Sequence, residues 1–203
     1  YLVSKDHYGL IELFGSEDKF IKKLDSLYLI TEKVEGEEIS PDISGLIGQY
    51  AQGNEPNHHI PYLYAYVGQP WKTAKLIREI DEKFYSTKPD GLCGNEDLGQ
   101  MSAWYVLSSM GFYSVNPANG IYVMGSPLVN SAVIHHKEGI SFAIKAIDNS
   151  KTNIYIQKAE YNGKPYTKSY ITHDMIVKGG ELKLYMGSKP STTFGVKKAD
   201  RPL

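Results

Sequence analysis

The spacing of apolar residues changes once along the chain, close to Pro117, and this change limits the fold more than any other feature. Before it, apolar side chains such as Phe20 and Leu24 recur at the spacing of one helix face. After it, Phe142 and Ile144 alternate with small or polar residues, as in a half-buried strand. The pattern predicts an α+β chain: a helical array followed by a small antiparallel β-region.

Start and stop signals give approximate bounds for these elements. Ser16 is a good N-cap for the first amphipathic helix, and Asn57 could cap another that stops at Gly68. Asn162-Gly163 predicts a hairpin turn. The predicted helices after the first are 43–50, 57–67, 71–84 and 98–110, and the predicted strands include 153–161, 170–177 and 181–186. Residues 32–38 are acidic and predict an exposed loop.

Composition excludes several classes of protein. The net charge is −1 without a block of like charge, so nothing favours nucleic acid as a partner. No apolar run approaches the ~20 residues that span a bilayer. Cys93 is the only cysteine, which rules out an intramolecular disulfide. The 16 tyrosines suit sugar binding, but many fall in strand-like stretches, where sheet surfaces explain them better.

Polar chemistry is concentrated in two loops, each placed before a predicted helix: residues 53–59 and residues 91–100. A helix N-terminus favours an ionised carboxylate, which both a general base and a metal ligand require. Their Asn, Asp and Glu oxygens suit a hard cation such as Ca²⁺, but the same residues are also common as caps and turn formers. His58 and His59 are adjacent and lack the i, i+4 spacing of a helical zinc site.

The two loops also carry a family resemblance. The strings GNEPNHHIPYLY (53–64) and GLCGNEDLGQMSAWY (91–105) resemble hallmarks of glycoside hydrolase family 92. Shorter segments at 111–113, 125–127, 162–164 and 186–187 are similar in kind and order. The resemblance implies an (α/α)₆ barrel after an N-terminal β-sandwich, with a β-rich end packed on the barrel. It also implies Ca²⁺-dependent hydrolysis of terminal α-mannosides, often α-1,2-linked, with inversion at the anomeric carbon.

By this resemblance, residues 1–117 are the C-terminal helices of an incomplete barrel, and residues 118–203 form the β-region. Asp97 is the candidate general base, with Glu96 as a second catalytic candidate. Asn54 and Glu55 are candidates for the calcium site. Candidates for substrate binding are Glu55, His58, His59 and Asn95, although the histidines could instead orient their loop.

The general acid of the family lies just before the helix that residues 1–13 resemble, so the chain is expected to lack it. Glu12 and Glu17 resemble structural positions and are not assigned that role. We therefore expect this fragment to be inactive alone, and its truncated barrel edge to favour self-association. The family alone suggests an extracytoplasmic location.

Two other functions compete with this interpretation. The chain could be a non-catalytic carbohydrate-binding or structural domain, which is compatible with a catalytic parent. A sugar phosphorylase on a similar barrel would need basic residues for its anion, and neither loop contains Arg or Lys.

Overall fold

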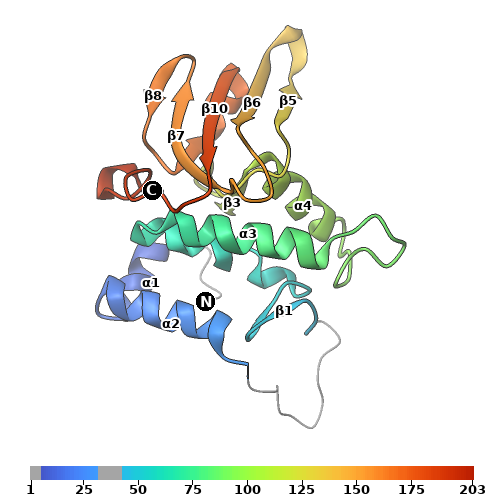
Figure 1. Cartoon of the computed structure of the whole chain (residues 1–203), viewed down its shortest axis with the longest axis vertical. Helices are drawn as coiled ribbons and strands as arrows, with labels where there is room; N and C mark the ends of the chain where they lie inside the picture. The colour runs from blue at the N-terminus through green and yellow to red at the C-terminus, as the bar shows by residue number, and fades with distance from the viewer. Residues whose placement is uncertain (1–5, 32–42) are drawn as a thin grey trace.

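The computed structural model describes residues 6–31 and 43–203 (Figure 1). The predicted acidic loop at 32–38 and the first five residues lie outside them. The helices are α1 (His7–Leu13), α2 (Glu17–Leu29), η1 (Glu55–Asn57), η2 (Ile60–Val67), α3 (Pro70–Phe84), α4 (Gln100–Met110), η3 (Lys137–Gly139), α5 (His173–Lys178) and η4 (Lys198–Asp200). The strands are β1 (Leu46–Ile47), β2 (Tyr50–Ala51), β3 (Phe112–Asn116), β4 (Ile121–Met124), β5 (Ser131–His135), β6 (Ser141–Ile147), β7 (Tyr155–Tyr161), β8 (Lys164–Tyr166), β9 (Tyr170–Thr172) and β10 (Gly180–Gly187).

Several helix ends lie where the sequence signals predicted them. The Ser16 side chain accepts a hydrogen bond from the Lys19 N–H and caps α2, as predicted. Gly68 and Gly111 end η2 and α4 with left-handed backbone, at φ 70° and 100°. In Figure 1, α3 crosses the middle of the molecule, with the large sheet above it and α1, α2 and β1 below it.

The strand layer contains two sheets besides the β1–β2 hairpin. The larger has the order β5-β6-β10-β7-β8, and β3, β4 and β9 form an antiparallel sheet of three strands. β10 lies between β6, to which it is parallel, and β7, to which it is antiparallel. The prediction of a wholly antiparallel region was therefore wrong: the large sheet is mixed, because the chain crosses over between β6 and β10 instead of returning by a hairpin.

Three local predictions were also wrong. Residues 46–51 form a short hairpin rather than part of a helix, since Gly45 and Gly48 take left-handed conformations around it. The strand predicted at 170–177 stops at Thr172, which caps α5 by accepting from the Met175 N–H. The 57–67 helix is a pair of 3₁₀ segments, and Asn57 lies inside η1 instead of capping a helix.

The buried apolar residues form two clusters, one mainly among the helices and one mainly among the strands. One cluster joins α1, α2, η2, α3 and α4 around residues such as Leu24, Ile77 and Trp104. The other lies on one face of the large sheet, with Phe142 and Leu184 among its members, and also includes residues of β3, β4, β9 and α5. The chain is thus an α+β protein. Within the described ranges, no helix combines the length and the apolar character needed to cross a bilayer.

Candidate active site

Two glycines bring the polar loops into direct contact. A Cβ on Gly94 would lie 2.5 Å from the Gly53 Cα, and a Cβ on Gly53 would lie 3.0 Å from the Cys93 carbonyl oxygen. The first distance is shorter than real Cβ atoms approach backbone, so position 94 requires glycine, and the second leaves very little room for a side chain at position 53. Residues 53–59 and 91–100 therefore meet, although they are far apart in sequence.

The His58 side chain forms hydrogen bonds to Gln52, just before the first loop, and to Gln100 on α4. Its Nε2 lies 2.9 Å from the Gln52 carbonyl oxygen, and its Nδ1 lies 3.1 Å from the Gln100 Nε2. Gln100 also donates to the Tyr113 hydroxyl at 3.0 Å, and the Trp104 indole N–H donates to the His58 carbonyl at 3.1 Å. Both ring nitrogens of His58 are thus engaged inside the protein, which favours an orienting role over sugar binding.

Burial fixes the protonation state of this imidazole. His58 is 1% exposed. Desolvation lowers its pKa to about 4, reinforced by nearby His59 and opposed by the bond to the Gln52 backbone. A neutral ring has one donor and one acceptor. The contacts assign the N–H to Nε2, which donates to Gln52, and the lone pair to Nδ1, which accepts from Gln100.

Glu96 has a structural partner at the start of α4. Its two carboxylate oxygens accept from the backbone N–H and the hydroxyl of Ser102, at 3.2 and 3.0 Å. Ser102 lies in the first turn of the helix, where N–H groups lack intrahelical acceptors and a negative charge is stabilising. The carboxylate of Glu96 therefore caps α4.

Asp97 is held in a different way. Asp97, Leu98 and Gly99 have φ values of 35°, 58° and 87°, three consecutive left-handed residues that turn the chain sharply into α4. Such backbone is uncommon for a non-glycine residue and costs energy, and strain of this kind clusters at functional sites. The Asp97 side chain is exposed and makes no hydrogen bond or ion pair within the described residues. Its carboxylate is free to meet a water or a ligand.

The remaining candidates lie around the same pair of loops. Glu55 is half-buried, and its Oε1 is buried without a hydrogen-bond partner in the described part of the chain. Asn54 is half-buried next to it, and Asn95 is exposed on the second loop. His59 is 7% exposed and points toward α1, with its ring centroid 6.2 Å from that of His7.

Several residues that build this region lie outside the set of candidates predicted from the sequence. Gln100 and Trp104 lie one helical turn apart on α4, so a signal for a shared face was present in the motif. Tyr85 stacks on Trp104 and accepts from the Gln52 amide at 2.9 Å, which ties the end of α3 to the site. No local sequence pattern predicts the contact between Tyr85 and Trp104, because it depends on tertiary packing.

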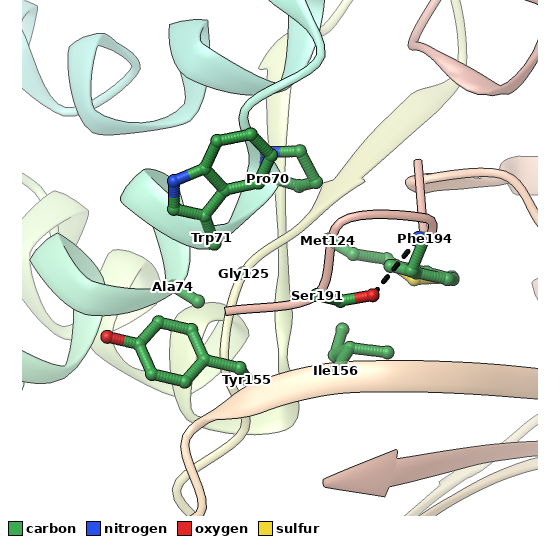
Figure 2. Close-up of a pocket in the computed structure, with 9 residues that line it drawn as sticks. All are labelled: Pro70, Trp71, Ala74, Met124, Gly125, Tyr155, Ile156, Ser191 and Phe194. Carbon is green, nitrogen blue, oxygen red and sulfur yellow. Dashed lines mark hydrogen bonds between the residues drawn. The ribbon is translucent and has the colours of Figure 1, made fainter. Parts of the chain in front are cut away.

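A small cavity elsewhere in the molecule does not belong to this site. It has a volume of about 10 Å³, close to the minimum for a single water molecule. Figure 2 shows its lining side chains, from α3 and the adjoining strands and C-terminal loop: Pro70, Trp71, Ala74, Met124, Gly125, Tyr155, Ile156, Ser191 and Phe194. The one hydrogen bond drawn there runs from the Phe194 N–H to the Ser191 hydroxyl. The cavity is a packing gap between the two layers.

The fold and the site together define an α+β protein with a loop-built cluster of carboxylates, amides and imidazoles, a chemistry typical of glycoside hydrolases. Residues 1–188 match the model of the glycosyl hydrolase family 92 catalytic domain. The chain belongs to this family.

Comparison with similar proteins supports the assignment to this family. An α-mannosidase of the family from Bacteroides thetaiotaomicron, solved with mannoimidazole, is 41% identical over 92% of this chain, with a TM-score of 0.87. An inverting mannosidase of the family from Bacteroides thetaiotaomicron VPI-5482 is 41% identical over 98% of this chain, with a TM-score of 0.85. A curated protein of Arthroderma benhamiae, described as an uncharacterized secreted glycosidase, is 30% identical over 100% of this chain. The chain spans only 24%, 28% and 24% of these three proteins' lengths, respectively.

Proposed function

We propose that this chain is part of a longer exo-α-mannosidase, which removes terminal mannose from N-glycans or mannan with inversion at the anomeric carbon. We propose α-1,2-linked mannosides as its substrates. The support comes from family membership, from the 41% identity to two mannosidases of the family, and from the free carboxylate of Asp97. An extracytoplasmic location is also proposed, since one relative is described as secreted.

Asp97 is the main structural support for the proposed hydrolase activity, because it combines properties that a general base requires. Inversion requires one carboxylate to take a proton from water while the water attacks the anomeric carbon. That carboxylate must be charged, reachable by water and free of competing partners, and Asp97 meets the last two conditions in the structure. Glu96 caps a helix with both oxygens, so Asp97 is the better candidate of the pair.

The general acid that protonates the leaving oxygen is proposed to come from another part of the parent protein. In inverting enzymes the acid and the base are ~6.5–9.5 Å apart, which leaves room for the water. The two early glutamates are poor candidates. Glu17 forms an ion pair with Arg201 at 2.8 Å, and Glu12 is exposed on α1. We therefore propose that the 203-residue fragment is inactive by itself.

We propose Ca²⁺ as the cofactor, with Asn54 and Glu55 supplying part of its shell. The partnerless buried Oε1 of Glu55 is the hard, charged oxygen that calcium prefers. The described residues do not contain a group of three or more His, Cys, Asp or Glu side chains arranged for a metal. A shell of 6–8 oxygens would therefore need backbone carbonyls, water, sugar hydroxyls or other parts of the parent. When bound, the ion would engage sugar hydroxyls and help to distort the ring.

We also propose that residues 1–117 belong to an (α/α)₆ barrel completed by the parent, and that residues 118–203 are a β-region packed on it. The support is the family match, together with the change from mainly helical elements before residue 112 to mainly strands after it. Leu13 and Leu29, at the ends of α1 and α2, are 85% and 75% exposed. In a fragment, such apolar surface would favour self-association.

The test replaces Asp97 with Asn in the full-length protein and measures hydrolysis of an α-1,2-mannobioside. The amide keeps the shape but cannot accept the proton, so kcat should fall by ~10²–10⁴-fold while KM changes little. Asp90→Asn is the matched control, because Asp90 is an exposed aspartate that precedes the same loop. Near-normal turnover by Asp97→Asn would show that the base lies elsewhere.

A further inference from the structure

A second group of polar rings lies next to the first loop, on the side facing α1. His7 is 4% exposed, and its ring centroid is 4.6 Å from that of Tyr66 and 6.2 Å from that of His59. Tyr66 is 1% exposed, and its ring centroid is also 5.7 Å from that of Tyr8. The His7 ring therefore lies near both a buried tyrosine and a histidine of the candidate site.

Two atoms of this group are buried without partners. The His7 Nε2 and the Tyr66 hydroxyl have no hydrogen bond to any residue in 6–31 or 43–203. Buried polar atoms are satisfied in the great majority of cases, so two orphans on rings in contact need an explanation. Tyr8 offers the contrast, because its hydroxyl donates to the Pro202 carbonyl at 2.8 Å.

Both orphaned groups are neutral. Burial lowers the pKa of His7 to about 4, helped by nearby His59 and opposed by Asp6. Burial also raises the pKa of the Tyr66 hydroxyl. A neutral imidazole nitrogen and a phenol can each form a hydrogen bond with a small hydroxyl-bearing molecule. The chemistry therefore fits a water or a sugar hydroxyl.

We propose that His7 is a positioning residue for His59: its ring braces the His59 imidazole, and its Nε2 and the Tyr66 hydroxyl bind one water or sugar hydroxyl beside it. This inference rests on the proposed function, in which His59 contacts the substrate. A histidine that only fills the core would have its nitrogens satisfied by protein groups, which the His7 Nε2 is not.

The kinetic test uses three variants of the full-length protein. His7→Phe keeps a ring and removes both nitrogens, while His7→Gln keeps an amide that can replace them. Tyr8→Phe is the matched control: it lies on the same helix and contacts the same Tyr66, but its hydroxyl bonds to the chain's C-terminal end. A misplaced substrate contact can cost on the order of 10²-fold in rate. We expect that loss in kcat/KM for His7→Phe, recovery to within about tenfold for His7→Gln, and a near-normal value for Tyr8→Phe.

Normal kcat and KM in His7→Phe, with only a lower melting temperature, would overturn the proposal, because His7 would then be structural. If His7→Phe does not fold, Tyr66→Phe takes its place, because it keeps the ring and removes the second partnerless atom. A smaller kcat/KM for Tyr66→Phe than for Tyr8→Phe, at equal melting temperature, supports the proposal, and equal values overturn it.

A crystal structure separates this inference from the proposed function, because it needs no activity. We expect the His59 ring to rotate in His7→Phe relative to the unmutated protein, and an unchanged ring would overturn the proposal. Crystals of the unmutated protein with and without mannose distinguish the two occupants: density at the His7 Nε2 in both indicates water, and density only with mannose indicates a sugar hydroxyl. No density in either would also overturn it. Failure to cleave mannosides would instead count against the proposed function.

Discussion

The buried imidazole of His58 makes the stability of this chain depend on pH in a way that can be calculated. In the folded chain its pKa is about 4, against 6.5 for an unperturbed histidine. Between these two values the unfolded chain binds a proton at His58 and the folded chain does not. Stability is therefore complete above pH 6.5 and falls as the pH falls through 6.5 toward 4.

The size of the effect follows from the difference between the two pKa values. Each pH unit is worth about 1.4 kcal/mol, so acidification across the whole window removes about 3 kcal/mol from the free energy of unfolding. His58 is 1% exposed, so solvent screening calls for little discount. A change of this size is a large part of the ~5–15 kcal/mol typical of a domain.

The assay is urea denaturation of the 203-residue chain at pH 7 and at pH 4.5. His58→Gln retains one donor and one acceptor but cannot be protonated. We expect its free energy of unfolding to change less between the two pH values than that of the unmutated chain, by about 3 kcal/mol at most. His135→Gln is the control, because His135 is exposed on β5. Equal pH dependence in the unmutated chain and His58→Gln would refute the reasoning, as would an equal effect of His135→Gln.

Two other predictions concern the proposed cofactor and the fragment. In calorimetric titration of the full-length protein with Ca²⁺, Glu55→Gln should weaken calcium binding by about tenfold or more, because a charged carboxylate ligand is replaced by a neutral amide. An unchanged calcium affinity would show that Glu55 is not a ligand. The 203-residue chain with Ca²⁺ should not hydrolyse an α-1,2-mannobioside measurably, because the proposed acid and pocket walls lie elsewhere. Turnover within tenfold of the full-length protein would contradict this and direct attention to Glu55 and Glu96 as acids.

Local signals in the sequence predicted part of the local structure, although the elements predicted at 43–50, 57–67 and 170–177 were wrong. The apolar spacing of residues 71–84 gave α3, and Gly68 and Gly111 ended their helices where a left-handed residue was expected. Asn162 and Gly163 have φ values of 49° and 75°, which is the backbone that a tight hairpin turn needs. Each of these features depends on residues close together in the chain.

Features that depend on distant residues were not predictable in the same way. The parallel pairing of β6 and β10 depends on strands separated by β7, β8 and β9, and the alternation of apolar residues is the same for either direction. At the site, the quoted motifs located the two loops, but the bonds of Gln100 to His58 and Tyr113 span 42 and 13 residues. The packing of His7 against Tyr66 likewise has no signature in the sequence.

The most direct test of the proposed function is the stereochemistry of the first product. The full-length protein is mixed with an α-1,2-mannobioside and Ca²⁺, and the anomeric protons are followed by NMR before mutarotation scrambles them. An inverting mechanism predicts that β-mannose appears first and that α-mannose follows only by mutarotation. Initial release of α-mannose, or no hydrolysis at all, would contradict the proposal.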